Sequence, residues 1–483
     1  MKIMLVFPPK GFTSKEMLPP LGLAYVAAVL EKNKYQVEIV DALVENYSWN
    51  KLKKKFTEEK PDVVGITALT ENRFEVFKTA EIAKNSLPNS TIVLGGPHVF
   101  HTAQDTLEHI RPVDVIVRGE GEYTMLELCN KLKNNEPLDD VNGISFRKNG
   151  EIIHNKPREL IRNLDELPFP AYHLLKFEKY NFKLDVPGKG KLRAASIVTS
   201  RGCPFHCVFC ETSLVFGKRW RARSPDNIIK EIEFLQDTYN IKALWFNDDT
   251  FTLSKKRIID FCNLLIEKNI EIYFTCSIRV DTVDKELLKL MKDAGCYKIF
   301  YGVESGSQKI LDDVVGKRIT IKQIRQVSKW LDELGIIKNP SYVISFPEET
   351  YEDAMKTLQL MKEIGGEPSF SFLKIYPGTD VEHIARQKGI LPKDFSWSLK
   401  SSMKEIETIP IVHGNAPIFR DKLSWEEISE IAVQWARMRK YPLAKKIPSI
   451  LKNLKSREDL ERYLSIFKAY VKSFLKRDKT VGG

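Results

Sequence analysis

The sequence predicts an α/β protein with two consecutive domains, each built on a parallel sheet, followed by a helical C-terminal region. Apolar runs alternate with amphipathic helical patterns over residues 1–135, and the alternation resumes over residues 191–390. From about residue 400 only helical patterns remain, which makes residues 391–483 the helical region. Strand-helix alternation with short connections is typical of parallel sheets covered by helices.

The first domain, residues 1–135, is expected to form a doubly wound, Rossmann-like sheet. Its predicted strands are residues 3–7, 36–40, 63–68, 91–94 and 113–117, and its predicted helices are 21–32, 51–59, 73–87, 101–109 and 123–134. Ligands of such sheets bind outside the carboxyl ends of the strands. The candidate binding residues in those loops are Thr67, Leu69, Thr70, Gly95, Gly96, Pro97, His98, Gly119 and Glu120.

Residues 136–190 are expected to connect the two domains. They contain Pro, Gly and polar clusters and no long periodic segment. Residues 141–147 and 151–154, separated by a turn at Asn149-Gly150, predict a β-hairpin.

The second domain, residues 191–390, repeats the strand-helix unit six times. Its predicted strands are 193–199, 243–247, 271–277, 298–303, 340–345 and 369–376, and its predicted helices are 225–239, 255–267, 285–293, 321–334 and 351–364. Six units are too few for a closed eight-stranded barrel, so a six-stranded partial (β/α) barrel is expected. Its chemistry should lie at the carboxyl ends of the strands.

The helical region carries most of the chain's positive charge. Residues 437–479 contain fourteen Lys and Arg against four Asp and Glu, whereas the whole chain has a formal charge of +11. Helices are expected at 425–439, 443–454 and 457–476. They either pack on the barrel or lie on an anionic membrane, which would favour a lipid or anionic substrate. Because the rest of the chain is near neutral, no specific nucleic acid is expected.

The cysteines and the apolar runs indicate a cytoplasmic protein, with a peripheral position on the membrane as the alternative that the basic helices allow. No run approaches the length of about twenty apolar residues that a membrane span needs. Seven cysteines form no disulfide framework. Cys129, Cys262, Cys276 and Cys296 lie in apolar patterns typical of core positions.

The remaining three cysteines form the most specific motif in the chain. Cys203, Cys207 and Cys210 follow the first strand of the predicted barrel with C-x3-C-x2-C spacing, and Phe209 precedes the last of them. Thiolates suit iron–sulfur clusters, and three of them leave one iron of a 4Fe–4S cluster open. The alternative is a zinc site, which needs a fourth ligand, or three core thiols.

This motif resembles the signature of the radical S-adenosylmethionine (SAM) superfamily. The resemblance implies that the three cysteines bind the cluster, whose open iron chelates SAM. Polar residues after the next strands match what this superfamily places around SAM, although each set alone fits a loop cap or salt bridge equally well. The residues that the resemblance assigns to SAM are Phe209, Asp248, Asp249, Arg279, Glu304 and Ser305. In the fifth loop, Ser345 and Glu348 replace two glycines that relatives commonly carry.

The first domain resembles the cobalamin-binding domain that many radical SAM enzymes carry. The matching segments are Leu18-Pro19-Pro20-Leu21-Gly22-Leu23, Thr67-Ala68-Leu69-Thr70, Gly95-Gly96-Pro97-His98 and Arg118-Gly119-Glu120-Gly121-Glu122. A Rossmann-like domain with another ligand is the alternative. The familiar Asp-x-His-x-x-Gly signature is absent from the sequence, which favours cobalamin with no histidine on cobalt. His98 is the nearest alternative ligand, but a structural role is preferred.

The combined resemblance implies an enzyme with a 4Fe–4S cluster, SAM and cobalamin as cofactors. The leading hypothesis is a methyltransferase that acts on an unactivated carbon through a 5′-deoxyadenosyl radical and methylcobalamin. An external electron donor of the flavodoxin or ferredoxin type is expected. A radical cyclase or ring-rearranging enzyme on the same scaffold is one alternative, and a non-catalytic cobalamin or redox sensor is the other.

Overall fold

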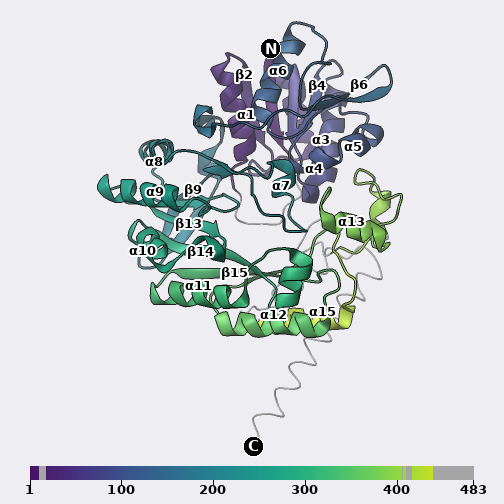
Figure 1. Ribbon diagram of the computed structural model, residues 1–483. Helices are drawn as coiled ribbons and strands as arrows, with labels where there is room; N and C mark the ends of the chain where they lie inside the picture. Colours follow the sequence, from purple (N-terminus) through teal and green to yellow (C-terminus); the bar gives the residue numbers. More distant parts are fainter. Residues whose placement is uncertain (10–17, 405, 409–415, 439–483) are drawn as a thin grey trace, which may run out of the picture.

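A computed structural model describes residues 1–9, 18–404, 406–408 and 416–438. Two α/β domains stack one above the other, with the first domain at the top of Figure 1 and the second beneath it. Helices α12 and α15 run along the lower face of the second domain (Figure 1). The arrangement agrees with the fold class that the sequence predicts.

The first sheet has seven strands in the order β2-β1-β3-β4-β5-β6-β7. The first five are parallel: β1 (Lys2–Phe7), β2 (Gln36–Asp41), β3 (Val63–Thr67), β4 (Thr91–Gly95) and β5 (Val115–Val117). Its helices are α1 (Leu21–Lys32), α2 (Trp49–Glu59), α3 (Arg73–Ser86), α4 (Pro97–His101), α5 (Ala103–His109) and α6 (Gly121–Lys133).

Helices cover both faces of this sheet because its strands are apolar on both sides. On β1, Ile3 and Leu5 join the core under α1 and α6, whereas Met4 and Val6 join the core under α2 and α3. Alternate residues of a strand point to opposite faces, so one strand contributes to both cores.

The predicted hairpin forms and extends the first sheet. Its strands are β6 (Ile144–Lys148) and β7 (Glu151–His154), and β6 pairs antiparallel with β5. Asn149 and Gly150 both have positive φ at the turn, as a two-residue hairpin requires. The connection then runs through three short 3-10 turns, Leu164–Glu166, Tyr172–Leu174 and Phe177–Lys179.

The second sheet contains the six predicted parallel strands and one antiparallel edge strand. The parallel strands are β9 (Gly190–Ile197), β12 (Ala243–Phe246), β13 (Tyr273–Ile278), β14 (Cys296–Glu304), β15 (Ile337–Ile344) and β16 (Ser369–Phe372). The edge strand, β8 (Lys183–Val186), pairs antiparallel with β9 and is absent from the sequence prediction. It is short, and lysine and aspartate interrupt its apolar pattern.

The helices of the second domain form an outer layer on this curved sheet (Figure 1). They are α8 (Pro225–Tyr239), α9 (Lys255–Glu267), α10 (Lys285–Asp293), α11 (Ile321–Glu333) and α12 (Tyr351–Ile364). Each begins after a Ser, Thr or Asp whose side chain accepts a hydrogen bond from the first turn, which satisfies a free backbone amide. These N-caps explain why the predicted first residues of the five helices agree with the structure.

A small antiparallel ribbon separates the cysteine motif from the main sheet. Its strands, β10 (Ser200–Arg201) and β11 (Arg221–Ala222), pair with each other. The residues between them, 202–220, are called the cluster loop below. This loop contains the three cysteines of the motif and one short helix, α7 (Thr212–Val215).

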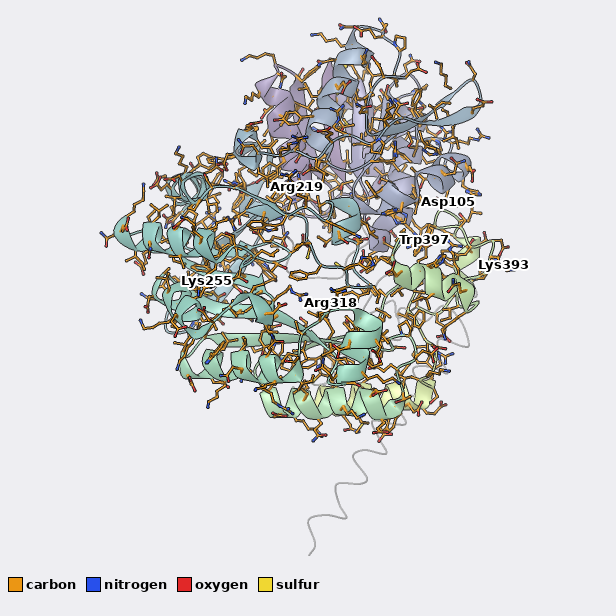
Figure 2. All side chains as sticks on the ribbon, in the orientation of Figure 1. Asp105, Arg219, Lys255, Arg318, Lys393 and Trp397 are labelled. Carbon is orange, nitrogen blue, oxygen red and sulfur yellow. The ribbon has the colours of Figure 1, made fainter. Side chains whose placement is uncertain are left out.

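The segment after the barrel returns to the first domain. It contains α13 (Asp380–Gln387), a 3-10 turn at Ser401–Met403, and α15 (Trp425–Met438), which contacts α12. The Ser398 amide donates to an Asp105 carboxylate oxygen at 2.9 Å. Figure 2 shows Trp397 beside the first domain, near Asp105. The two domains are thus joined by this segment as well as by the connection.

Two of the predicted elements differ from the structure by more than three residues at one end. The helix predicted at 101–109 is two helices, α4 and α5, which meet at Thr102, where the backbone leaves the helical conformation. The strand predicted at 369–376 ends at Phe372. The helices predicted at 443–454 and 457–476 lie outside the described residues. No helix in the described ranges is long and apolar enough to cross a membrane.

Candidate active site

Cys203, Cys207 and Cys210 line one cavity of about 200 Å³ at the carboxyl ends of the barrel strands. All three are half-buried, and burial raises the pKa of the Cys207 thiol to about 11. In the described part of the chain, no three His, Cys, Asp or Glu side chains converge as they would on a single metal ion. A cluster does not require such convergence, because each thiolate binds a different iron. This space is called the cluster cavity below.

Arg279 follows β13 and lies on the wall of the cluster cavity. Its Nε and Nη2 donate to the Asp281 carboxylate at 3.0 and 2.9 Å, and Nη2 also donates to the Lys317 carbonyl at 2.8 Å. The Phe205 ring lies 3.5 Å from the guanidinium carbon. These contacts fix the side chain and leave Nη1 available to a carboxylate ligand.

Glu304 and Lys317 form a buried ion pair on the same wall. Lys317 Nζ lies 2.7 Å from Glu304 Oε1 and also donates to the Gly302 carbonyl at 2.7 Å. Only 10% of the Glu304 side chain and 6% of the Lys317 side chain are exposed. Glu304 has φ 62° at the end of β14, so the chain turns there and the carboxylate faces the cavity.

Asp248 and Asp249 follow β12 and have different surroundings. Asp248 is buried and accepts hydrogen bonds from the Thr199 amide (2.7 Å), the Thr199 hydroxyl (2.6 Å) and the Ser200 hydroxyl (2.6 Å). Asp249 is exposed to the cavity, accepts from the Thr212 hydroxyl at 2.8 Å, and has its pKa raised by desolvation. Asp248 therefore fixes the backbone that precedes the cluster loop, whereas Asp249 is accessible to a ligand.

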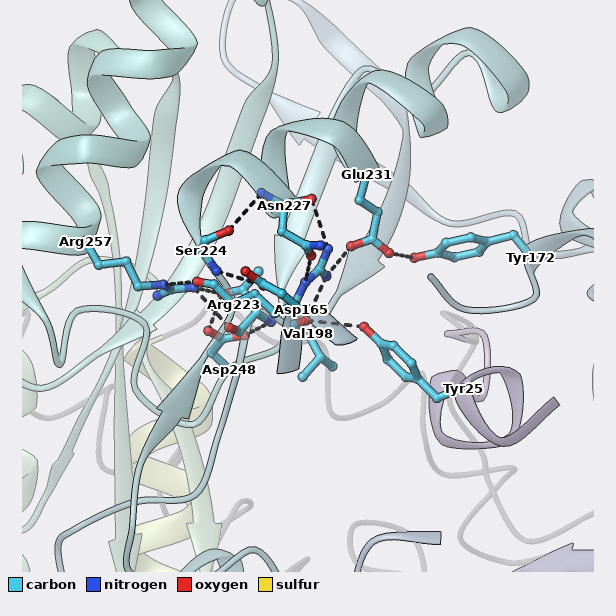
Figure 3. A network of polar contacts seen from close by, with 11 residues as sticks. Tyr25, Asp165, Tyr172, Val198, Arg223, Ser224, Asn227, Glu231, Asp248 and Arg257 are labelled. Carbon is cyan, nitrogen blue, oxygen red and sulfur yellow. Dashed lines mark hydrogen bonds and ion pairs between the residues drawn. The ribbon is translucent and has the colours of Figure 1, made fainter. Parts of the chain in front are cut away.

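Two buried arginines reinforce the backbone that Asp248 holds (Figure 3). Arg257 Nη2 donates to the Thr199 carbonyl at 3.1 Å, and Arg223 Nη1 donates to the Val198 carbonyl at 3.2 Å. Arg223 also forms an ion pair with Glu231, which accepts a hydrogen bond from the Tyr172 hydroxyl. The barrel thus holds the start of the cluster loop through Arg223, which precedes α8, Arg257 of α9 and Asp248 of the loop after β12.

A second cavity, of about 440 Å³, opens at the carboxyl edge of the first sheet. Thr67, Gly95, Gly96, Pro97, Gly119 and Glu120, all predicted as binding residues, line it. It continues between the sheet and α1 and α6, where Leu5, Gly65, Val93 and Met125 form its walls. A Cβ atom added to Gly65 would lie 2.8 Å from Leu5 Cδ2, so the missing side chain keeps this space open.

The two cavities are adjacent, because Asp249 lines both of them. No other residue is common to their linings within the described ranges. Barrel residues such as Ser200, Arg201 and Asn247 complete the wall of the larger cavity. A molecule between the cavities would therefore contact both domains.

His98 is buried in the first turn of α4 and does not line either cavity. Its Nδ1 lies 3.1 Å from the Thr70 hydroxyl, and its ring packs 6.3 Å from the Phe77 ring and 6.0 Å from the Trp397 ring. Burial holds the pKa of His98 well below its ordinary value, and nearby Arg73 lowers it further. The geometry gives His98 a packing role between the first domain and the segment that follows the barrel.

The structure therefore divides the predicted binding residues into three sets. The cluster cavity includes Cys203, Cys207, Phe209, Cys210, Asp249, Arg279 and Glu304. The larger cavity includes the six residues of the first domain named above. Outside both linings are Leu69, Thr70, His98, Asp248 and Ser305, of which Ser305 hydrogen-bonds with Thr357.

The loop after β15 keeps the backbone shape that glycines would allow. Ser345 and Glu348, which stand where relatives commonly have glycine, have φ 73° and 59°. The Glu349 carboxylate accepts hydrogen bonds from the Ser345 amide (2.5 Å) and the Phe346 amide (3.1 Å), which stabilises the turn. Burial raises the pKa of Glu349 to about 8.

Several residues of the site carry no recognisable signal in the sequence. Lys317 follows the short helix Ile310–Val315 and its capping Gly316, and no motif marks it. Gly65 lies inside an ordinary apolar strand pattern. Arg201 and Arg221 flank the cysteine motif, but their carboxylate partner, Glu120, is 81 and 101 residues away in the sequence. Pairs so distant are visible only in the folded chain.

Residues 11–129 match the B12 binding domain family, and residues 197–361 match the Radical SAM superfamily. An uncharacterized methyltransferase of Pyrococcus horikoshii is 39% identical over 396 residues, which cover 81% of this chain and 84% of that protein. This chain belongs to the cobalamin-binding radical SAM enzymes. Accordingly, its cofactors are a 4Fe–4S cluster, SAM and cobalamin.

Two further comparisons define how far this cobalamin-binding radical SAM enzyme resembles known proteins. The anaerobic magnesium-protoporphyrin IX monomethyl ester cyclase of Rubrivivax gelatinosus is 31% identical over 352 residues, covering 71% of this chain and 62% of that protein. The radical enzyme OxsB, solved with aqua-cobalamin and SAM, aligns with TM-score 0.73 and 21% identity over 96% of this chain and 72% of its own. The second likeness shows a shared fold.

Proposed function

We propose that this enzyme methylates an unactivated carbon of a small-molecule or lipid substrate. The observation that carries the proposal is the pair of adjacent cavities, which have Asp249 in common. Bound there, the cluster supplies the electron that cleaves SAM to a 5′-deoxyadenosyl radical, and cobalamin supplies the methyl group. A substrate between the cavities would be reached from both sides, which is what hydrogen abstraction followed by methyl transfer requires.

The residues of the larger cavity fit cobalamin. Gly95, Gly96 and Gly119 at the mouth leave backbone groups free to approach a flat macrocycle and its amide side arms. The apolar extension past Gly65 suits a side arm that carries a displaced base. None of the described lining residues is a histidine, so we propose that cobalamin binds here without a histidine on cobalt.

The residues of the cluster cavity fit SAM beside an iron–sulfur cluster. We assign Cys203, Cys207 and Cys210 to three irons, and Arg279 Nη1 to the carboxylate of SAM. Phe209, packed 5.9 Å from the Phe346 ring, is assigned to the adenine. Glu304, held by Lys317, is assigned to a polar group of SAM. Their partners within the protein hold these side chains in place before SAM binds.

The positions of the cysteines support an electron donor that is a separate protein. The four cysteines outside the motif are all buried in cores, so they offer no ligands for a second cluster on the surface. We therefore propose that a small redox protein of the flavodoxin or ferredoxin type reduces the cluster.

The test of the proposed function uses SAM labelled with a trideuterated methyl group. The reconstituted enzyme is incubated anaerobically with this SAM, hydroxocobalamin and a chemical reductant, and the products are analysed by mass spectrometry. We expect 5′-deoxyadenosine from the radical reaction, S-adenosylhomocysteine from methyl transfer to cobalamin, and methylcobalamin carrying the label.

Each alternative predicts a different product set. A radical cyclase, the activity named for the Rubrivivax relative, would form 5′-deoxyadenosine without labelled methylcobalamin. A cobalamin or redox sensor would form neither product. Either result would contradict the methyltransferase proposal.

A further inference from the structure

The two ends of the cluster loop lie side by side in the β10–β11 ribbon. Arg201 pairs directly with Arg221 across this ribbon, and Cys203 follows only two residues after Arg201. Gly202 has φ 84°, and a Cβ atom there would lie 2.7 Å from the Arg219 carbonyl oxygen. Any displacement of the ribbon would therefore move the cysteines with it.

One carboxylate of the first domain holds both strands of this ribbon. Glu120 Oε1 accepts from Arg201 Nη1 at 2.9 Å and from Arg221 Nη1 at 2.9 Å. Glu120 Oε2 accepts from Arg221 Nη1 at 2.8 Å and from the Ile161 amide at 2.7 Å. The Glu120 carboxylate thus joins three parts of the chain: the first domain, the connection between the domains, and the ribbon that carries the cluster loop.

A second carboxylate, Glu122, belongs to the same group of charged side chains and accepts a hydrogen bond from Arg201 Nη2 at 2.6 Å. The exposed fractions of the four side chains are 3% for Glu120, 5% for Glu122, 9% for Arg201 and 4% for Arg221. Burial lowers the pKa of Arg201, but Glu122 and Glu120 outweigh burial, and the net shift is upward. Two carboxylates and two guanidiniums balance in charge, so each charge depends on the others.

This set of residues also belongs to the larger cavity, which is called the cobalamin cavity below because we assign cobalamin to it. Glu120, Glu122 and Arg201 all line it. Glu120 immediately precedes α6, and Glu122 lies in its first turn, where the helix dipole favours negative charge. Glu120 is one of the residues predicted to bind cobalamin, but its carboxylate already accepts four hydrogen bonds from protein groups.

We propose that Glu120 is a positioning residue that fixes the cluster loop relative to the cobalamin cavity, acting through Arg201 and Arg221. This inference rests on the proposed function, because it assigns the cluster and cobalamin to these two cavities. The barrel-side contacts of Asp248, Arg223 and Arg257 hold the backbone at Val198 and Thr199, just before the ribbon. Glu120 and Glu122 both connect the ribbon to the other domain's cavity, but of the two only Glu120 contacts both strands of the ribbon in the described residues.

The first test measures the cluster loop itself by hydrogen–deuterium exchange in the full-length chain, with and without cofactors. Glu120→Gln keeps the size of the side chain but removes its charge. We expect backbone exchange in residues 202–220 to accelerate about tenfold in this variant, because local opening exposes amides that the ribbon protects. Glu122→Gln, which leaves the Glu120 contacts intact, should accelerate the same residues about threefold.

The matched control is Glu45→Gln. Glu45 is another carboxylate of the first domain, 5% exposed, which pairs with Lys176 of the connection and does not touch the cluster loop. Exchange in residues 202–220 should remain at the wild-type rate in this control. Arg201→Lys provides a second probe if Glu120→Gln does not fold. An ammonium keeps the positive charge but lacks the two separate nitrogen atoms through which Arg201 binds Glu120 and Glu122.

A second readout separates positioning from general stability. Pulsed electron paramagnetic resonance measures the distance between the reduced cluster and cob(II)alamin in the reconstituted enzyme. In Glu120→Gln we expect a broadened or shifted distance, because the cluster loop is no longer held against the other domain. Glu45→Gln should match wild type in both measurements.

Two results would overturn the inference. One is wild-type exchange in residues 202–220 of folded Glu120→Gln, or of Arg201→Lys where the first variant does not fold. The other is an unchanged cluster-to-cobalt distance in the reconstituted variant. Absence of 5′-deoxyadenosine from the wild-type enzyme would instead contradict the proposed function, and exchange in the cofactor-free chain would still decide the role of Glu120.

Discussion

The cluster cavity and the cobalamin cavity adjoin at Asp249 but differ in the groups that form them. Charged and aromatic side chains surround the cluster cavity, with Arg279, Lys317 and Glu304 fixed by contacts to one another and to neighbouring backbone. Glycines and aliphatic side chains form much of the cobalamin cavity, and Gly65 keeps its interior open by having no side chain.

This difference indicates two ways of binding a cofactor. A small, charged ligand such as SAM is recognised by side chains whose positions are fixed before it binds. A large macrocycle requires space and access to backbone, which small residues supply. Substitutions should therefore affect the two cavities separately, and the following predictions test that separation.

The largest expected effect is that of Cys203→Ala. Loss of one thiolate should prevent stable cluster assembly and lower SAM cleavage by about a thousandfold or more, because no other group supplies the electron. Cobalamin retention should stay near wild type, since Cys203 does not line that cavity. Iron content, 5′-deoxyadenosine formation and bound cobalamin test this. Retained SAM cleavage would contradict the cluster assignment, and the buried Cys262→Ala variant is the control.

Gly65→Leu should weaken cobalamin binding and leave the cluster intact, which is the reverse of the result expected for Cys203→Ala. The added side chain would occupy the inner part of the cobalamin cavity and collide with Leu5, so cobalamin affinity should fall roughly 10- to 100-fold. Cluster content and its spectrum should remain unchanged. Gly65→Ala, with a single added carbon, should fall between wild type and Gly65→Leu. Cobalamin binding at wild-type strength in Gly65→Leu would show that no part of cobalamin enters this space.

Arg279→Lys should weaken SAM binding about tenfold, because an ammonium cannot hold Asp281 and the Lys317 carbonyl while also reaching a carboxylate. The change that SAM causes in the spectrum of the reduced cluster gives the affinity. Arg325→Lys is the matched control, since Arg325 forms an exposed fork with Glu363 on the outer helices. Equal SAM affinities for the wild type and Arg279→Lys would remove Arg279 from the site.

His98 should affect acid stability rather than cofactor binding. Its pKa is lowered by burial, so the unfolded chain binds a proton below about pH 6.5 that the folded chain does not. Protonation of the unfolded chain therefore lowers the free energy of unfolding as the pH falls below this value, by about 1 kcal/mol at pH 5.5. Above this pH the free energy of unfolding is not reduced in this way. His98→Gln should lose this part of the pH dependence of unfolding.

Cobalamin absorption in His98→Gln should remain that of the wild type, because His98 does not line the cobalamin cavity. A changed spectrum at neutral pH would mean that His98 binds cobalt. Identical pH dependence of unfolding in the wild type and His98→Gln would mean that folding does not lower the pKa of His98.

Most of the fold could be predicted from the sequence, because periodic patterns and helix caps are local signals. Ser224 before Pro225 marks the start of α8, and the hydroxyl accepts from Asn227 in the structure. The edge strand β8 lacks such a signal, since its four residues are interrupted by charge. The pairing of the hairpin with β5 depends on contacts between separate segments, which no local pattern contains.

The cluster cavity was more predictable than the cobalamin cavity for the same reason. Asp249, Arg279 and Glu304 follow consecutive strands, so a chain of parallel strands brings them to one edge. Gly65 and Lys317 carry no recognisable motif. Glu120 was predicted as a cobalamin residue, but its contacts with Arg201 and Arg221 could not be predicted, because these arginines belong to another domain.

The most direct test of the central claim is an anaerobic absorption spectrum of protein reconstituted with iron, sulfide and hydroxocobalamin and then desalted. Two separate cavities predict cobalamin bands together with the broad absorbance of an iron–sulfur cluster. Cys203→Ala should keep only the cobalamin bands, and Gly65→Leu should keep the cluster absorbance with weakened cobalamin bands. A wild-type spectrum with a cluster but no cobalamin would contradict the assignment of the first domain and the methyltransferase proposal with it.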